Sequence, residues 1–322
     1  MKTLRQLLPL LAAVAGLLVL FRLLVGNFLS AENMLDLAQQ ISVNAILAFG
    51  MTLVILIGGI DLSVGALLAL VGVTTVAGLI TFCGTETQSL GGLIAAVLLG
   101  FGAAAVLGAF NGLCAAQTRM PPFIITLGTM LVARGAALRF NEGQPIHIPD
   151  AQKLFLALGN GRLCGAAKLP VPVLVMLVLF TLAAVLLHRT RFGQHLYAIG
   201  GNREAARYTG IPVARVEMAV YVICALLTAV AGMINASQLY SGEPIAGQGF
   251  ELNAIAAVVV GGTSFTGGIG TMYGTLIGAV IIGILDKGLN QAGVHFSLQY
   301  IVKGLVILAA VYVDVRKRAQ SR

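Results

Sequence analysis

Residue types that could support catalysis are present in this chain, but they do not occur in catalytic patterns. The nucleotide-binding pattern GxxxxGK[ST], the zinc-protease pattern HExxH and the nucleophile pattern GxSxG are all absent. The four histidines are too dispersed for an obvious metal site. The acids at or near the ends of apolar runs form no evident carboxylate pair; they are Asp61, Glu217, Glu251, Asp286 and Asp314. We therefore expect that this chain is not an enzyme and that it binds neither a metal nor a cofactor.

A glycine-containing segment interrupts two apolar runs at 58–65, with the sequence GGIDLSVG. Gly58, Gly59 and Gly65 permit unusual backbone angles, and Asp61 is a good cap for a helix that starts directly after it. This pattern favours a tight turn. The alternative is a broken helix beside a translocation path, with Asp61 at its lip, and the two interpretations are compatible.

A second glycine-containing segment repeats the first at an offset of 209 residues. Residues 44–71 and 253–280 share ten identities in 28 positions, and Gly267, Gly268 and Gly274 match the three glycines of the first copy. Apolar sequence also matches by chance, so a true repeat stays open. Repeats with glycine-interrupted segments at corresponding positions point to a transport site near the repeat interface. If the chain crosses the membrane in ten spans, the two copies run parallel to each other.

The composition predicts that these segments are positioned by membrane helices. Of 322 residues, 58% are hydrophobic and 10% are charged, 40 are glycine, and tryptophan is absent. Soluble domains carry about 25% charged residues, and a membrane helix needs about 20 apolar residues. The apolar runs fall at about 7–26, 35–57, 61–82, 91–116, 123–138, 171–187, 216–236, 251–265, 271–286 and 298–313. We expect an all-α polytopic membrane protein with about ten transmembrane helices in a single domain over 1–322.

The distribution of basic residues predicts the orientation of these spans. With the N-terminus in the cytoplasm, 12 of the 20 lysines and arginines face inward, which favours both termini inside. The net charge of +8 follows from this bias and not from nucleic-acid binding, because no stretch interleaves basic and aromatic residues. Ala13-Val14-Ala15 resembles a signal-peptide cleavage site, but the apolar run continues beyond it, so we favour an uncleaved first span.

Two long connections stand out, an outward loop at 140–170 and a basic inward loop at 188–215. Loops of this length in a compact bundle are more often functional than filler. In the inward loop, Asn202 is a good N-cap, Glu204 suits the first turn of a helix, and Gly210 fits the position after its end. A two-turn helix without a long apolar face is marginal in water. The pattern therefore indicates a surface helix that docks into a partner.

Three long segments resemble the signatures of sugar-importer ABC permeases of the ribose type. They are SVNAILAFGMTLVILIGGIDLSVGALLAL from Ser42, GQHLYAIGGNREAARYTGI over 193–211, and ELNAIAAVVVGGTSFTGGIGTMYGTLIGA over 251–279. The resemblance covers nearly the whole chain. These motifs are specific to the family and much less specific for the sugar.

The resemblance implies the permease subunit of an ATP-driven monosaccharide importer in the bacterial cytoplasmic (inner) membrane. It implies a vitamin-importer-like (type II) bundle that forms a homodimer among membrane lipids, with a cytosolic ATP-binding cassette subunit and a periplasmic sugar-binding protein as partners. ATP and Mg²⁺ would bind the ATPase and not this chain. Residues 204–210 are similar to the core of the permease EAA loop, although its Ile-x-Leu-Pro ending is not found. The coupling helix implied by this match comprises Asn202, Arg203, Glu204, Ala205, Ala206, Arg207, Tyr208 and Gly210.

A sugar path needs weakly polar groups inside the bundle. The candidates are Gln40, Asn44, Thr52, Asp61, Asn235 and Asn253. For each of these side chains, hydrogen bonding between helices is the alternative role. The loop at 140–170 is the candidate contact for the binding protein, and a disulfide between Cys83 and Cys164 stays open there.

Two other classes of protein stay open. A passive facilitator or an ion-coupled secondary transporter would use ionisable residues within spans, for which Lys303 and Arg134 are the candidates. Both side chains can also reach an interface by snorkelling. A structural or receptor protein without transport is the third reading. Uptake in reconstituted vesicles without ATP or a partner would favour the second class.

Overall fold

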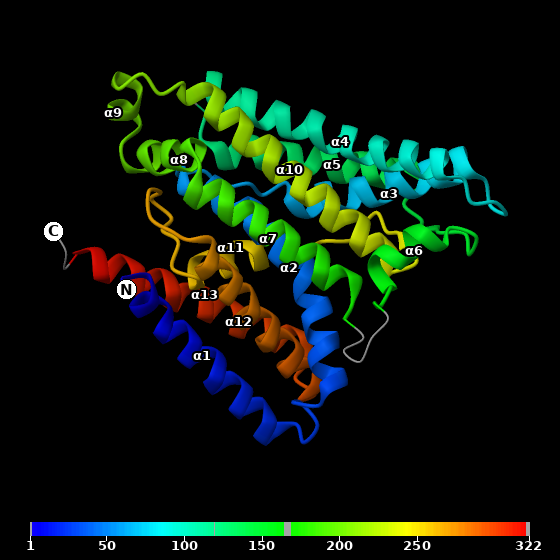
Figure 1. Ribbon diagram of the computed structural model, residues 1–322, viewed down its shortest axis with the longest axis horizontal. Coiled ribbons are helices and arrows are strands. Elements are labelled where there is room, and N and C mark those ends of the chain that lie inside the picture. The colour runs from blue at the N-terminus through cyan, green and yellow to red at the C-terminus, as the bar shows by residue number, and fades with distance from the viewer. Residues whose placement is uncertain (1, 119, 164–168, 320–322) are drawn as a thin grey trace.

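The fold is a bundle of α-helices, seen in a computed structural model that describes residues 2–118, 120–163 and 169–319 (Figure 1). The long helices of the first half are α1 (Lys2–Leu24), α2 (Ala31–Leu56), α3 (Val64–Cys83), α4 (Leu90–Gln117) and α5 (Pro122–Phe140). The middle of the chain adds α6 (Lys153–Asn160), α7 (Val171–Arg189), α8 (Arg191–Gly201), α9 (Arg203–Tyr208) and α10 (Val213–Gln238). The last helices are α11 (Phe250–Val260), α12 (Met272–Gln291) and α13 (Phe296–Ala319). Two short strands, β1 (Ile146–His147) and β2 (Ser241–Gly242), pair antiparallel.

The expected all-α membrane architecture is confirmed. In the described part of the chain, eight helices are long and apolar enough to cross a membrane, and α11 together with the first part of α13 supplies two shorter apolar segments. These ten helices correspond to the ten predicted runs. The second begins earlier than predicted, at Ala31, because the Ser30 hydroxyl caps it by accepting from the Asn33 amide. The third begins later than predicted, at Val64, because the turn at 57–63 occupies the start of its run.

Helices α2 and α3 form the centre of the bundle, and a row of small residues on α4 (Gly100, Ala104, Gly108 and Gly112) packs against α3 and α10. Gly100 lies against Thr75 of α3, and Gly108 and Gly112 lie against Ala225 and Met218 of α10. Small residues let helix backbones approach closely where lipid supplies no hydrophobic force between them. The row therefore serves helix packing.

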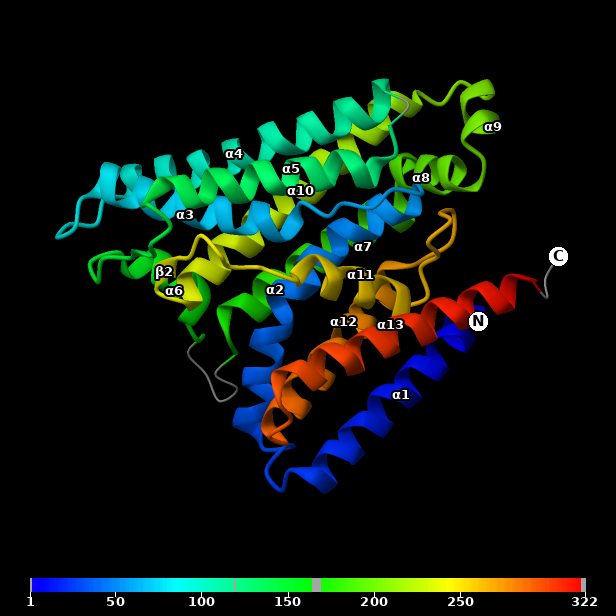
Figure 2. The same cartoon turned by 180° about the vertical axis from the view of Figure 1, so that it is seen from behind.

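The two ends of the bundle carry different elements. Both termini lie at the end that also carries α8 and α9, as the two opposite views show (Figures 1 and 2). At the other end lie α6 and the β1–β2 pair, so the described part of the loop at 140–170 contains a helix and a short strand. We refer below to the α8–α9 end and the α6 end.

Candidate functional site

The segment at 188–215 folds as two consecutive capped helices at the α8–α9 end. The Thr190 hydroxyl accepts from the Gly193 amide at the start of α8, and Asn202 Oδ1 accepts from the Ala205 amide at 2.9 Å at the start of α9. Gly210 has a φ of +85° and closes the end of α9. Both caps that the sequence predicts for the short helix are therefore present. The sequence did not predict α8.

Helix α9 presents most of its surface to the outside. Ala206 is its buried residue, whereas Tyr208 is 86% exposed. Arg203, Glu204 and Arg207 are also exposed. Among the described residues, Glu204 and Arg207 form no ion pair. The helix is thus a capped, charged projection whose free groups can meet a second molecule.

A bidentate ion pair joins α9 to the start of α10. Arg203 Nη1 lies 2.5 Å from Glu217 Oε1, and Arg203 Nη2 donates to Glu217 Oε2 at 2.8 Å. The Glu217 side chain is only 3% exposed, so the pair fixes a buried carboxylate. Paired hydrogen bonds of this kind add geometric specificity to the attraction of the charges. The pair therefore fixes α9 to the start of α10.

A backbone junction joins α8 to both glycine-containing segments. Gly200 in the last turn of α8 lies against the Leu56 carbonyl at the end of α2 and against the Gly268 amide in the turn between α11 and α12. The Gly268 amide donates to the Leu56 carbonyl at 2.9 Å. A Cβ on Gly200 would overlap both groups, so glycine is required for this approach. We call Leu56, Gly200 and Gly268 the glycine junction.

Side chains reinforce the glycine junction from α7 and α8. The Tyr197 hydroxyl donates to the Gly270 carbonyl at 2.8 Å, and its burial raises the pKa of this hydroxyl to about 12. His188 Nε2 accepts from the Met272 amide at 3.2 Å, and its ring stacks on Tyr273. The start of α12 is thus held by α7 and the turn before it by α8.

The first glycine-containing segment is a tight turn with Asp61 folded into it. Asp61 is 2% exposed, and its Oδ1 accepts from the Ser63 amide at 2.9 Å and from the Ser63 hydroxyl at 2.6 Å. Burial raises the pKa of the Asp61 carboxyl, and the two bonds from Ser63 oppose that shift. These contacts are the ones expected for the tight turn that the sequence favours. Asp61 points into this turn and is not among the residues that line the cavity described below.

The six glycines of these segments supply positive φ angles in the two turns or close contacts with neighbouring elements, and Gly59 lies against the Tyr221 hydroxyl of α10. Gly58, Gly267 and Gly268 have positive φ angles of +80°, +84° and +73°. Gly65 lies against the Gly247 carbonyl, and Gly274 against the Gly261 carbonyl. Both copies of the 209-residue echo therefore fold as helix, glycine turn, helix. Since the Gly268 amide bonds to the Leu56 carbonyl, both turns lie at the α8–α9 end and the copies run parallel.

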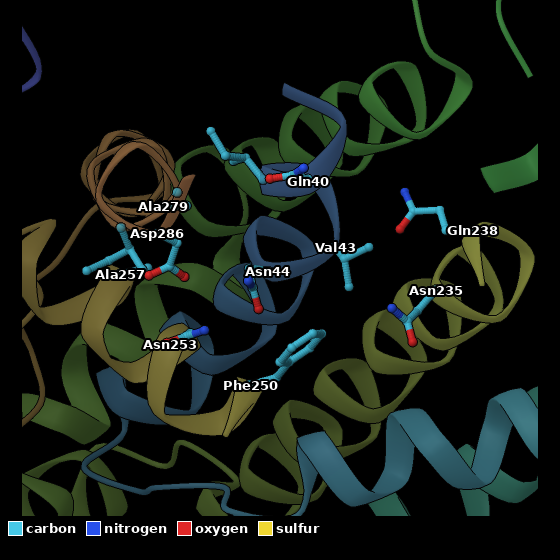
Figure 3. Close-up of a pocket in the computed structure, with 13 residues that line it drawn as sticks. Gln40, Val43, Asn44, Asn235, Gln238, Phe250, Asn253, Ala257, Ala279 and Asp286 are labelled. Carbon is cyan, nitrogen blue, oxygen red and sulfur yellow. The ribbon is translucent and has the colours of Figure 1, made fainter. Parts of the chain in front are cut away.

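Four of the six predicted path residues line one cavity of about 260 Å³ between α2, α10, α11 and α12 (Figure 3). They are Gln40, Asn44, Asn235 and Asn253. The cavity lies toward the α6 end, because Gln39 beside it donates to the Gly159 carbonyl of α6 at 2.9 Å. Thr52 lies outside it and bonds to the Thr275 hydroxyl at 2.7 Å. Thr52 thus makes the interhelical contact that was its alternative role.

Nine further lining residues were not predicted as path residues, and among them Gln238, Phe250 and Asp286 are the polar or aromatic ones. Gln238 follows Asn235 by three residues, so helical periodicity alone places both on one face of α10. Asp286 was noted among the acids but not as a path residue. Its Oδ1 pairs with Lys303 Nζ of α13 at 2.9 Å, which no local pattern reveals.

Both candidates for ion coupling have partners in the structure. Lys303 is held by Asp286, and Arg134 Nη1 donates to the Pro244 and Ala246 carbonyls at 2.7 and 2.8 Å. Arg134 therefore orders the connection that follows β2 at the α6 end. These contacts give both cations a structural role.

The loop at 140–170 is tied down at several points. Gln152 donates to the Gly84 and Thr87 carbonyls, and Ser237 of α10 bonds to the Gly159 amide at 2.8 Å. Cys83 is a free, buried thiol at the edge of this region. Its possible partner Cys164 lies outside the described residues.

A bundle of apolar helices, an internal cavity lined by several amides and a projecting charged helix are features expected of a membrane permease. Residues 33–311 match the family described as branched-chain amino acid transport system / permease component, and the chain belongs to that family. The ribose import permease protein of Escherichia coli K12 is 45% identical over 310 residues, which are 96% of this chain and 93% of that protein. The ribose import permease protein of Bacillus subtilis 168 is 47% identical over 303 residues, or 94% and 91% of the two chains.

A more distant relative has another sugar in its name. The L-arabinose transport system permease protein of E. coli K12 is 36% identical over 314 residues, or 95% of this chain and 92% of that one. No solved structure matches the chain. The resemblance to sugar-importer permeases that the sequence motifs indicated is confirmed by these relatives.

Proposed function

We propose that this chain is the membrane permease subunit of an ATP-driven monosaccharide importer, with ribose as the first candidate substrate. The observation that carries the proposal is the capped, exposed helix α9 in a chain of this family, tied by α8 and Arg203 to the helices around a polar cavity. The names of the relatives support a monosaccharide, and ribose occurs in those most similar in sequence among the ones described above.

Two connections lead from the docking segment to the cavity. The Arg203–Glu217 pair acts on α10, and the glycine junction acts on α2 and on the turn between α11 and α12. The helices reached in this way are those whose other ends line the cavity. From Leu56 to Asn44, α2 spans 12 residues, or about 18 Å at ~1.5 Å per residue. Closure of a docked ATPase can thus tilt the cavity walls through rigid helices.

The partners follow from the position of each surface. We place α9 in the cytoplasm against an ATP-binding cassette subunit, which binds ATP and Mg²⁺ and performs the hydrolysis. The α6 end faces the periplasm, where the loop at 140–170 meets a sugar-binding protein. Both termini are then cytoplasmic, and the chain works as a homodimer in the inner membrane among its lipids. The residues we assign to docking are those of 202–210, and those we assign to the path are Gln40, Asn44, Asn235 and Asn253.

Reconstitution in proteoliposomes tests this function against a passive or ion-coupled transporter. Labelled ribose is supplied to vesicles that contain the complete assembly. The ATPase is on the inner side and the binding protein on the outer side, or the reverse where the permease has inserted in the opposite orientation. We expect accumulation above the external concentration only with ATP and both partners. Equilibration of ribose by the permease alone, or uptake driven by a proton or sodium gradient, would refute the importer.

A further inference from the structure

The side chain of Tyr221 on α10 reaches the first glycine-containing turn and ends there without a partner. Tyr221 is 1% exposed, and its buried hydroxyl makes no hydrogen bond to any of the described residues. A Cβ on Gly59 would meet this hydroxyl at 2.6 Å, so the hydroxyl rests against the backbone of the turn. Buried polar groups in native proteins are almost always satisfied, so an unpartnered one needs an explanation.

A second unpartnered atom belongs to a side chain that contacts the end of the same turn. Asn111 of α4 is 1% exposed, and its Nδ2 donates to the Ser63 hydroxyl at 3.1 Å. That hydroxyl in turn donates to Asp61 at 2.6 Å. The Asn111 Oδ1 is buried and accepts no hydrogen bond within the described part of the chain. A phenol hydroxyl donates and an amide oxygen accepts, so the two unpartnered atoms are chemically complementary.

Helices α4 and α10 pack so that these two side chains lie at one level of the bundle. Gly108 of α4 lies against the Tyr221 carbonyl. Gly112, one turn further along α4, lies against Met218, so Asn111 is placed between these two contacts. Helical side chains tilt toward the N-terminus of their helix, which directs the Tyr221 ring toward the level of Met218 and Asn111. Because glycines form this part of α4, no side chains interlock there to oppose a shift of α10 along it.

The ion pair with α9 lies one turn before Tyr221 on the same face of α10. Arg203 pairs with Glu217, and positions four residues apart are neighbours on a helix. The charges of Glu217 and Asp61 both act on the Tyr221 hydroxyl. The ion pair, the tyrosine ring and the first glycine-containing turn are therefore neighbours.

We propose that Tyr221 is a positioning residue for transport, whose hydroxyl donates to Asn111 Oδ1 in the conformation that alternates with the one seen here. Displacement of α9 shifts α10 through Glu217, and the new bond then latches α10 to α4. We call this contact the α4–α10 latch. Through Ser63 it also connects α10 to the first glycine-containing turn. The latch rests on the proposed function, and it adds a switched contact that this function does not require.

The energetic role of the latch follows from a comparison of the two conformations. Two unpartnered buried atoms disfavour the conformation seen here, and their mutual bond favours the other one. A difference of this kind biases a two-state equilibrium without any contact to the substrate. Small shear shifts between packed helices are an established form of such a transition.

Structures of the complex with the ATPase, without nucleotide and with a non-hydrolysable ATP analogue, test the latch directly. We expect the Tyr221 hydroxyl to lie about 2.8 Å from Asn111 Oδ1 in one of the two states and to be unbonded in the other. The same pairing in both states, whether bonded or apart, would overturn the latch.

The variant Tyr221→Phe removes the hydroxyl and keeps the ring. Its matched control is Tyr300→Phe, because Tyr300 is exposed on α13. We expect Tyr221→Phe to lower ATP-driven ribose uptake about tenfold, since it removes both the bond of one state and the unpaired group of the other. Its thermal midpoint should fall in the nucleotide state that has the bond and not in the other. An equal fall in both states would show a merely structural role and would overturn the latch.

A double variant tests the identity of the acceptor. Asn111→Leu should lower uptake in the wild type and change it much less in the Tyr221→Phe background, because the two residues share one interaction. Fully multiplicative losses would overturn the pairing of Tyr221 with Asn111.

These readouts separate the latch from the proposed function. The structures and midpoints depend on nucleotide binding and not on transport, so they test the latch even if the wild type imports no ribose. Absence of ATP-driven uptake in the wild type overturns the importer. Wild-type uptake that Tyr221→Phe leaves unchanged overturns the latch and leaves the importer standing.

Discussion

Replacing Gly200 with alanine tests the glycine junction at a single atom. The new methyl group would overlap the Leu56 carbonyl oxygen and the Gly268 amide nitrogen. Both are backbone atoms, joined to each other by the 2.9 Å bond between α2 and the turn before α12, so neither can yield by changing a rotamer. The neighbouring Gly201 offers a matched control, because a Cβ there meets no atom within 4 Å.

The magnitude follows from the nature of the overlap. Inserting a methyl group into a packed site costs about 1–3 kcal/mol, and an obstruction made of backbone belongs at the upper end, about 3 kcal/mol. Domains of 150–250 residues lose about 2–4 °C per kcal/mol, so we use the lower value for this longer chain and expect the midpoint of thermal unfolding to fall about 6 °C. Gly201→Ala replaces a helical glycine without a clash and should leave the midpoint unchanged or slightly higher.

Two assays read the result. Thermal unfolding in detergent gives the midpoint, and ATP-driven uptake in vesicles gives the coupling. Gly200→Ala should lower both the thermal midpoint and the ATP-driven uptake. The variant should still co-purify with the ATPase, because α9 keeps the Asn202 cap and the bond from Arg203 to Glu217. If Gly200→Ala behaves like Gly201→Ala in both assays, the junction neither stabilises the bundle nor transmits movement.

Three further variants test other contacts. Glu204→Arg reverses an exposed charge on α9 and should abolish co-purification with the ATPase while the thermal midpoint stays the same; undiminished co-purification would remove α9 from the interface. Arg203→Gln leaves the carboxylate of Glu217 buried without its ion pair and should lower the free energy of unfolding by about 2 kcal/mol, less than a fully buried pair because Arg203 is half exposed; the same loss in Arg207→Gln, whose side chain forms no ion pair, would contradict this. Thr52→Val should cost about 1 kcal/mol by leaving Thr275 unpaired, whereas Thr52→Val with Thr275→Val should be close to neutral; a double variant worse than the single one would give these hydroxyls a role beyond their mutual bond.

The sequence predicted features that depend on neighbouring residues. Ten apolar runs correspond to ten helices, and the caps of α9 follow from Asn202 and Gly210 because capping is local chemistry. The candidate path amides also meet in one cavity, although sequence alone could not separate a cavity from an interhelical bond. Thr52 shows the limit of prediction from sequence, because its hydroxyl is hydrogen-bonded to Thr275, 223 positions away.

The features that sequence reasoning missed depend on contacts across the bundle. The acids were examined for carboxylate pairs, but the partners of Glu217 and Asp286 are cations on other helices. The approach of Gly200 to Gly268 involves backbone atoms alone, so no side-chain type signals it. Helix α8 was missed because its glycines disfavour a helix in isolation, and it is stabilised by packing on the turns beneath it.

The sidedness of α9 is the central claim, and labelling of a Tyr208→Cys variant tests it most directly. Tyr208 is 86% exposed, so a cysteine there is open to a membrane-impermeant maleimide. The readout is the labelling that Tyr208→Cys adds over the native chain, which itself has four cysteines. We predict added labelling in inverted membrane vesicles, its loss when the ATPase is bound, and no added labelling in right-side-out vesicles. Labelling in right-side-out vesicles alone would place α9 outside the cell, where no ATPase can reach it, and would contradict the account.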